Sequence, residues 1–82
     1  MYIFSQHFIE QMQLRNISLE EAEDVLNNPQ QITTEDNLQV YQKIVYIDSK
    51  QYLLRIFVNE RKQPPVVVTG YRTSKVNKYL QQ

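Results

Sequence analysis

An arginine in the middle of an apolar strand is the residue of this chain with the clearest chemical potential. Arg55 lies between Leu54 and Ile56, where a charge is costly unless it is paired or faces a cleft. Its planar guanidinium could bind two oxygens of one phosphate group. Alternatively, Arg55 could pair with an acid from a helix, or lie on the open face of a sheet.

Cations, hydroxyls and phenols are concentrated in residues 69–79, around the only glycine of the chain, Gly70. Cations neutralise phosphates, hydroxyls donate hydrogen bonds to them and tyrosine rings stack on bases, so this mixture suits a nucleic-acid backbone. Gly70, at the end of a strand, would let the backbone approach a ligand or bend. The alternative is a solvated C-terminal tail. The residues that we expect to bind the nucleic acid are Arg15, Arg72, Thr73, Lys75 and Lys78.

Two residues of the N-terminal half could contribute to the same site. His7 is the only histidine, and histidine can take or give a proton near neutral pH, although a single histidine is more often structural. Arg15 could cap the end of a helix or join Arg55 at a cleft. The chain has no cysteine, and with one histidine a zinc site made by protein ligands alone is improbable. We therefore expect neither a metal nor a cofactor.

Charge is divided between the two parts of the chain. Residues 1–36 hold seven acids and one base, a balance of −6, whereas residues 37–82 hold eight bases and two acids, a balance of +6. The net charge of zero hides both values. Such asymmetry often marks a surface for a polyanion such as nucleic acid. Equally, the two parts could simply attract each other within the fold.

Two amphipathic helices are expected to precede the strands. Ser5 is a suitable N-cap for a first helix that repeats its apolar residues every four positions as far as residue 14. A second helix begins at the capping box formed by Ser18 and Glu21. It ends at residues 27–29, where asparagines precede a proline.

From Gln31 onward the apolar period is two, which is typical of strands. We predict a single α+β domain covering residues 1–82, with two N-terminal helices packed on one face of an antiparallel three- to four-stranded sheet. The exposed strand edges of so small a sheet could also pair two copies into a homodimer. The expected strands are residues 40–47, 52–58 and 65–72, with a weaker strand near 31–34, a brief edge strand at 1–4 and a short helix docked through Val76 and Leu80.

Several short motifs resemble those of one bacterial family. The motifs of the first half are Ser5-Gln6-His7, Met12, Arg15, Ile17-Ser18, Val25-Leu26 and Pro29. They resemble the opening of the domain-of-unknown-function family 4258, and residues 68–75 with Lys78-Tyr79 resemble its closing segment. The chain departs from the family pattern at three positions. Gln11 replaces a usual base, Phe8 a usual alanine, and Asn16 a common glycine, although asparagine tolerates left-handed backbone.

The resemblance implies a layout similar to RelE- and BrnT-like toxins, small α+β proteins that cleave RNA and are neutralised by an antitoxin. By this likeness the chain would be a metal-independent ribonuclease, in which the RNA 2′-hydroxyl attacks the adjacent phosphate. His7 would move a proton, Arg55 would hold the phosphate, and Tyr71 would stack on a base or act as an acid. These three side chains should then converge. The alternative is a non-catalytic module that binds RNA or a protein through the same basic surface.

A membrane location is not expected. No apolar run approaches the roughly 20 residues that span a bilayer, and the first residues lack the features of a signal peptide. We therefore expect a cytoplasmic protein.

Overall fold

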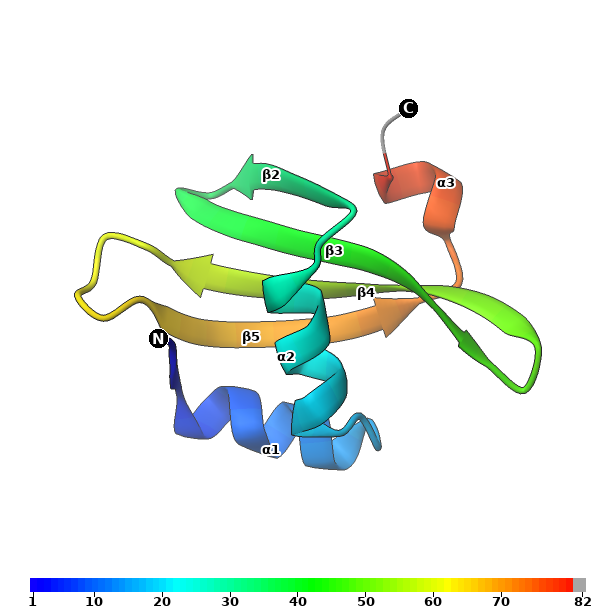
Figure 1. Cartoon of the computed structure of the whole chain (residues 1–82), viewed down its shortest axis with the longest axis horizontal. Coiled ribbons are helices and arrows are strands. Elements are labelled where there is room, and N and C mark those ends of the chain that lie inside the picture. Colours follow the sequence, from blue (N-terminus) through cyan, green and yellow to red (C-terminus); the bar gives the residue numbers. More distant parts are fainter. Residues whose placement is uncertain (81–82) are drawn as a thin grey trace.

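The computed structural model describes residues 1–80, which form three helices and five strands. Figure 1 shows α2 crossing in front of the strands, with α1 beside β5 and α3 toward the β2 margin in this view. The helices are α1 (Gln6–Leu14), α2 (Leu19–Asn27) and α3 (Val76–Tyr79), and the strands are β1 (Ile3–Phe4), β2 (Gln31–Glu35), β3 (Leu38–Ile47), β4 (Lys50–Asn59) and β5 (Val66–Thr73).

The sheet has five strands in the order β1-β5-β4-β3-β2. This confirms the α+β class but corrects the expected antiparallel three- to four-stranded sheet, since β1 pairs in parallel with β5 and makes the sheet mixed. The Ile3 amide donates to the Pro65 carbonyl at 2.9 Å, and the Ser5 amide to the Val67 carbonyl at 3.0 Å. The N-terminal segment thereby covers an edge of β5 that would otherwise leave backbone groups unpaired.

Side chains near in sequence determine where the two N-terminal helices begin. The Ser5 hydroxyl accepts from the Phe8 amide at 3.0 Å. At the second helix, the Ser18 hydroxyl accepts from the Glu21 amide at 3.1 Å, and the Glu21 carboxylate accepts from the Ser18 amide at 3.2 Å. Both expected caps are therefore confirmed. Between the helices Asn16 has φ 57°, the left-handed conformation that asparagine tolerates.

The core joins both N-terminal helices to the central strands. Alternation along β4 directs Leu54, Ile56 and Val58 to one face of the sheet, and all three are buried. Phe8 is the bulkiest helical contribution and is 0% exposed. The helical residues of this core cluster are Phe8, Met12, Ala22, Val25 and Leu26.

Gly70 lies in β5 because there is no space for a side chain. A Cβ atom at this position would lie 3.0 Å from Ile56 Cδ1, 3.1 Å from the Arg55 carbonyl oxygen and 3.2 Å from the Phe8 ring. Gly70 does not have a positive φ, so neither a sharp bend nor a ligand is needed to explain it. The close approach of Phe8 to the strand is sufficient.

Replacing Gly70 by alanine is expected to lower the free energy of unfolding by about 1–3 kcal/mol, because overpacking a filled core forces neighbours out of position. The Phe8 ring can shift, but the backbone carbonyl of Arg55 cannot shift without disturbing the sheet. Urea denaturation followed by circular dichroism would measure the change. Ser74→Ala, on an exposed residue after the same strand, serves as the control, and equal stability of the two variants would contradict the crowding.

None of the helices formed by residues 1–80 has the length and apolar character that a bilayer crossing requires.

Candidate functional site: a buried arginine and an exposed basic cluster

Arg55 is buried on β4, with 2% of its side chain exposed, and all three guanidinium nitrogens are engaged. Nε donates to Gln42 Oε1 at 2.8 Å, and Nη1 donates to the Tyr71 hydroxyl at 2.6 Å. Nη2 donates to Glu35 and forms an ion pair with it. Arg55 is therefore paired, but its acid comes from β2 rather than from a helix, and the group does not lie on an open face.

The strand register brings these partners together. Gln42 on β3 and Tyr71 on β5 lie directly opposite Arg55 on its two sides. Glu35 is the last residue of β2, the strand on the other side of β3. A single guanidinium thus links four adjacent strands.

Three aromatic rings surround the same guanidinium. The Cζ atom lies 4.3 Å from the ring centroid of Tyr79, 5.4 Å from that of Phe57 and 5.7 Å from that of Tyr71. Tyr79 belongs to α3, and its backbone carbonyl accepts from Gln42 Nε2 at 3.1 Å. We refer to the six residues Glu35, Gln42, Arg55, Phe57, Tyr71 and Tyr79 as the arginine cluster.

The pKa values in the arginine cluster follow from these contacts. Burial acts to lower the pKa of Arg55, but hydrogen bonds with Glu35 and Tyr71 outweigh it, so the net direction is upward. Burial raises the pKa of Tyr71, and the neighbouring Arg55 offsets only part of the rise. The pKa of Tyr79 is lowered by the Tyr71 hydroxyl and by Lys78. At neutral pH Arg55 is therefore a cation, and the Tyr71 hydroxyl to which it donates is a neutral phenol.

The structure does not bring His7 to the arginine cluster. Alternation along β4 directs Arg55 to the sheet face opposite that of Ile56, and Ile56 shares the core with Phe8 of α1. His7 is exposed on α1. Of the three side chains expected to converge, Arg55 and Tyr71 are in contact, and His7 belongs to the helix beyond the opposite face.

A second cluster of cations lies where α1, β4 and β5 end or begin, with Arg15 and Lys50 exposed and Arg72 half-buried. Arg72 Cζ lies 5.5 Å from the Tyr52 ring centroid, and Lys50 Nζ lies 5.7 Å from the same centroid. Arg72 Nη2 donates at 3.3 Å to the backbone carbonyl of Arg15, the C-cap residue of α1. This contact uses the backbone of Arg15, whose side-chain Nε donates to Gln11 Oε1 at 3.3 Å. Arg15 thus lies beside Arg72 through its backbone and makes no contact with Arg55 in the described residues. We refer to Arg15, Lys50, Tyr52 and Arg72 as the basic cluster.

The other predicted RNA-binding residues follow β5. The Thr73 hydroxyl accepts from the Lys75 amide at 3.1 Å, which fixes the turn after the strand. Lys75 and Lys78 are exposed, and Lys78 Nζ lies 5.2 Å from the Tyr79 ring centroid. Neither lysine has a carboxylate partner within residues 1–80.

Both ion pairs found in residues 1–80 join an acid of the first 36 residues to a base further along the chain. Lys43 Nζ lies 2.7 Å from Asp24 Oδ2 and lowers the pKa of Asp24, and the second pair is Arg55 with Glu35. The two oppositely charged parts do attract each other in the fold, but most of the bases remain unpaired in the described residues. No three histidine, aspartate or glutamate side chains of this region gather closely enough to hold a metal ion.

Several members of the two clusters were not expected from the sequence. Gln42 could have been predicted, since a polar residue inside the strand 40–47 needs a hydrogen-bond partner in the same way as Arg55. Tyr79 was noted among the phenols of residues 69–79, but its contact with Arg55, like that of Glu35, depends on the tertiary fold. Tyr52 could have been noted as an aromatic residue two positions after Lys50 on one face of a strand.

A family model described as Domain of unknown function (DUF4258) matches residues 4–75. The match includes the whole basic cluster, and all of the arginine cluster except Tyr79. No curated protein and no solved structure matches the chain.

Proposed function

The chain belongs to the DUF4258 family, and we propose that it binds RNA through the basic cluster without cleaving it. One observation carries the proposal. Arg55, the cation best suited to clamp a phosphate, is buried with every nitrogen engaged. By contrast, Arg15 and Lys50 are exposed and Arg72 is half-buried, and none of the three has an acidic partner within residues 1–80. The proposal implies a cytoplasmic protein.

The chemistry of the basic cluster suits a single strand of RNA. Arg15, Lys50 and Arg72 would neutralise phosphates and release condensed counterions, which is the main source of nucleic-acid affinity. Tyr52 is half-buried, and an exposed part of an aromatic ring provides a surface on which a base can stack, worth about 1–3 kcal/mol per base. Cations beside an aromatic ring are the combination found on surfaces that bind single strands.

Replacing Lys50 and Arg72 together by glutamine is expected to weaken RNA binding at least about tenfold. It should also reduce the slope of log K against log salt by about 1.4, since each phosphate contact to a single strand contributes about 0.7. Fluorescence anisotropy with a labelled single strand of about 12 nucleotides, within the size range of such sites, would measure both quantities.

The matched control is the double variant Arg61→Gln/Lys62→Gln, which removes the same charge from the exposed loop between β4 and β5. This control should keep most of the affinity of the wild-type chain. Equal losses in the two double variants would mean diffuse attraction and would exclude the basic cluster as the site. Absence of RNA binding by the wild-type chain at low salt would exclude the proposed function.

A metal-independent ribonuclease is the second candidate, and it rests on the arginine cluster. Arg55 and Tyr71 are hydrogen-bonded at 2.6 Å beneath Tyr79 of α3, a helix of four residues. Displacement of α3 would present a cation and a phenol to the same phosphate. A RelE- or BrnT-like layout, with both N-terminal helices on one face of the sheet and an antitoxin as partner, is part of this candidate.

The two candidates differ in the fate of the RNA. Under the first proposal, labelled RNA is bound by the wild-type chain and recovered intact. New 5′ ends that disappear with Tyr71→Phe, a change that keeps the ring and removes the hydroxyl, would support the ribonuclease. A further loss of cleavage with His7→Ala would require His7 to reach the substrate from α1.

A further inference from the structure

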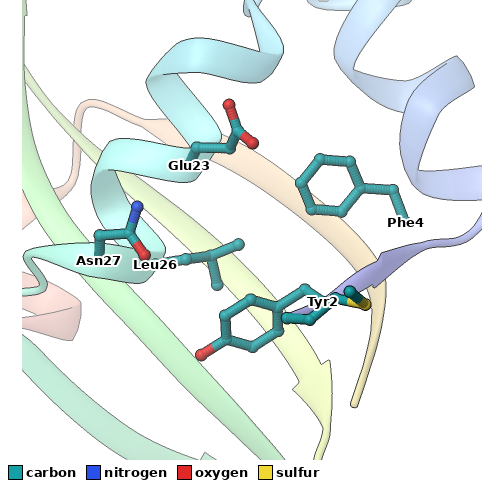
Figure 2. Close-up of a pocket in the computed structure, with 6 residues that line it drawn as sticks. Tyr2, Phe4, Glu23, Leu26 and Asn27 are labelled. Atoms are coloured by element: carbon teal, nitrogen blue, oxygen red, sulfur yellow. The ribbon is translucent and has the colours of Figure 1, made fainter. Parts of the chain in front are cut away.

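A cavity of about 310 Å³ opens between the N-terminal segment and α2, a volume at the lower end of the range for ligand pockets. Figure 2 shows the rings of Tyr2 and Phe4 on one side, across from Glu23, Leu26 and Asn27 of α2. Met1 completes the lining. The cavity therefore combines aromatic and aliphatic walls with a single carboxylate.

The aromatic wall is held in place from behind. The Tyr2 ring meets the Tyr41 ring edge to face, with centroids 6.3 Å apart. The Tyr41 hydroxyl donates to Glu60, and burial, followed by this hydrogen bond, raises the pKa of Tyr41 far above its ordinary value. On the other side the Phe4 ring packs against the Phe8 ring, with their centroids 5.3 Å apart. Both rings are thus positioned before any ligand arrives.

Glu23 is an acid of α2 that neither caps the helix nor forms an ion pair within residues 1–80. Glu21 completes the capping box of α2, and Asp24 pairs with Lys43. Glu20 lies in the first turn of the helix, where the macrodipole favours an acid. Glu23 lies beyond that turn, where the effect of the dipole falls off, and it has no ion-pair partner within residues 1–80. Its side chain is exposed and lines the cavity.

We propose that this cavity binds an arginine side chain from a basic segment of a protein partner. The aliphatic part of the arginine would lie along Leu26, and the planar guanidinium would pack on the rings of Tyr2 and Phe4. The Glu23 carboxylate would accept two parallel hydrogen bonds from the same group. A planar cation on an apolar chain is complementary to the aromatic rings, the aliphatic side chain and the carboxylate of the cavity together.

Charge around the cavity favours the same occupant. The cavity is formed by the first 36 residues, whose balance of −6 attracts basic segments. RNA would be repelled here, so this partner site is distinct from the basic cluster and does not depend on the proposed RNA binding.

An NMR titration of the full chain with a blocked pentapeptide containing one central arginine would test the proposal. The amide signals of Tyr2, Phe4 and Leu26 should shift, with a dissociation constant on the order of 1 mM for so small a probe. The same peptide with citrulline, a neutral group of the same shape, should not bind. Glu23→Gln should weaken binding about tenfold, which corresponds to the loss of a charge-assisted contact.

Glu20→Gln is the matched control, since it removes the same charge from an exposed position of the same helix, and it should leave the affinity unchanged. Equal binding of the arginine and citrulline peptides would overturn the proposal. So would equal weakening by Glu20→Gln, or signal shifts that do not include the cavity. RNA binding by the Glu23→Gln variant should remain that of the wild-type chain, whatever the outcome of the peptide titration.

Discussion

Replacement of Arg55 by methionine is expected to lower the free energy of unfolding by about 3 kcal/mol, because breaking a buried ion pair by removing one partner typically costs 3–5 kcal/mol. Gln42 is 0% exposed, and its Oε1 would lose the hydrogen bond that Arg55 Nε donates. The Tyr71 hydroxyl would likewise lose the hydrogen bond donated by Nη1. Glu35 is 43% exposed at its side chain, so water can solvate its freed carboxylate. That solvation places the expected loss at the lower end of the range.

Methionine is the informative replacement because it is long, flexible and apolar. It can keep most of the apolar packing against Phe57 and Tyr79, so the measured loss reports the polar contacts together with the attraction between the cation and the rings. Urea denaturation of the variant would be compared with that of Arg61→Met, an exposed loop arginine expected to change stability by less than about 0.5 kcal/mol. If Arg55→Met were instead more stable than the wild type, the buried arginine would destabilise the fold. Its retention would then favour the ribonuclease candidate, in which Arg55 serves a substrate.

The helices could be predicted from the sequence because their determinants are local. Each N-cap contact joins residues three positions apart, Ser5 with Phe8 and Ser18 with Glu21. The left-handed residue between the helices, Asn16, is likewise a property of one residue type in one turn. Signals of this kind do not depend on the tertiary fold.

The full sheet could not be predicted because its outer pairing is not local. The parallel pairing of Ile3 with Val66 joins the two most distant strands of the chain, and β1 is only two residues long. Neither strand carries a pattern that identifies the other. Gly70 shows the same limit, since the sequence indicates a bend or a close approach to a ligand, whereas the close packing of the Phe8 ring explains its presence.

The candidate site was predictable in part for the same reason. The position of Arg55 in an apolar strand indicated that it must be paired or face a cleft, and Tyr71 was placed in the same site. The acid that pairs with Arg55 depends on strand order, which brings Glu35 of β2 near, and no local pattern identifies this partner. The residue type of His7 indicated that it could move a proton, but no local pattern shows on which side of the sheet its helix lies.

The second large effect is expected from Phe8→Ala, which should lower the free energy of unfolding by about 4 kcal/mol, within the range for buried phenylalanine. Phe8 is 0% exposed and lies between Phe4 at 5.3 Å and the backbone of β5 at Gly70. Because Gly70 has no side chain, it cannot fill the space that the ring leaves next to it. A site that cannot collapse retains a larger cavity and loses more stability.

The double variant Phe8→Ala/Gly70→Ala tests this reasoning, since the added methyl group would then occupy part of the cavity instead of colliding with the ring. Gly70→Ala should therefore cost less in the Phe8→Ala background than alone, and the difference is the coupling free energy of a double-mutant cycle. Leu14→Ala, on an α1 residue that is 80% exposed, should change little. Additive effects at positions 8 and 70 would mean that the clash at Gly70 comes from the Arg55 carbonyl or Ile56, and that Phe8 stabilises the core by burial alone.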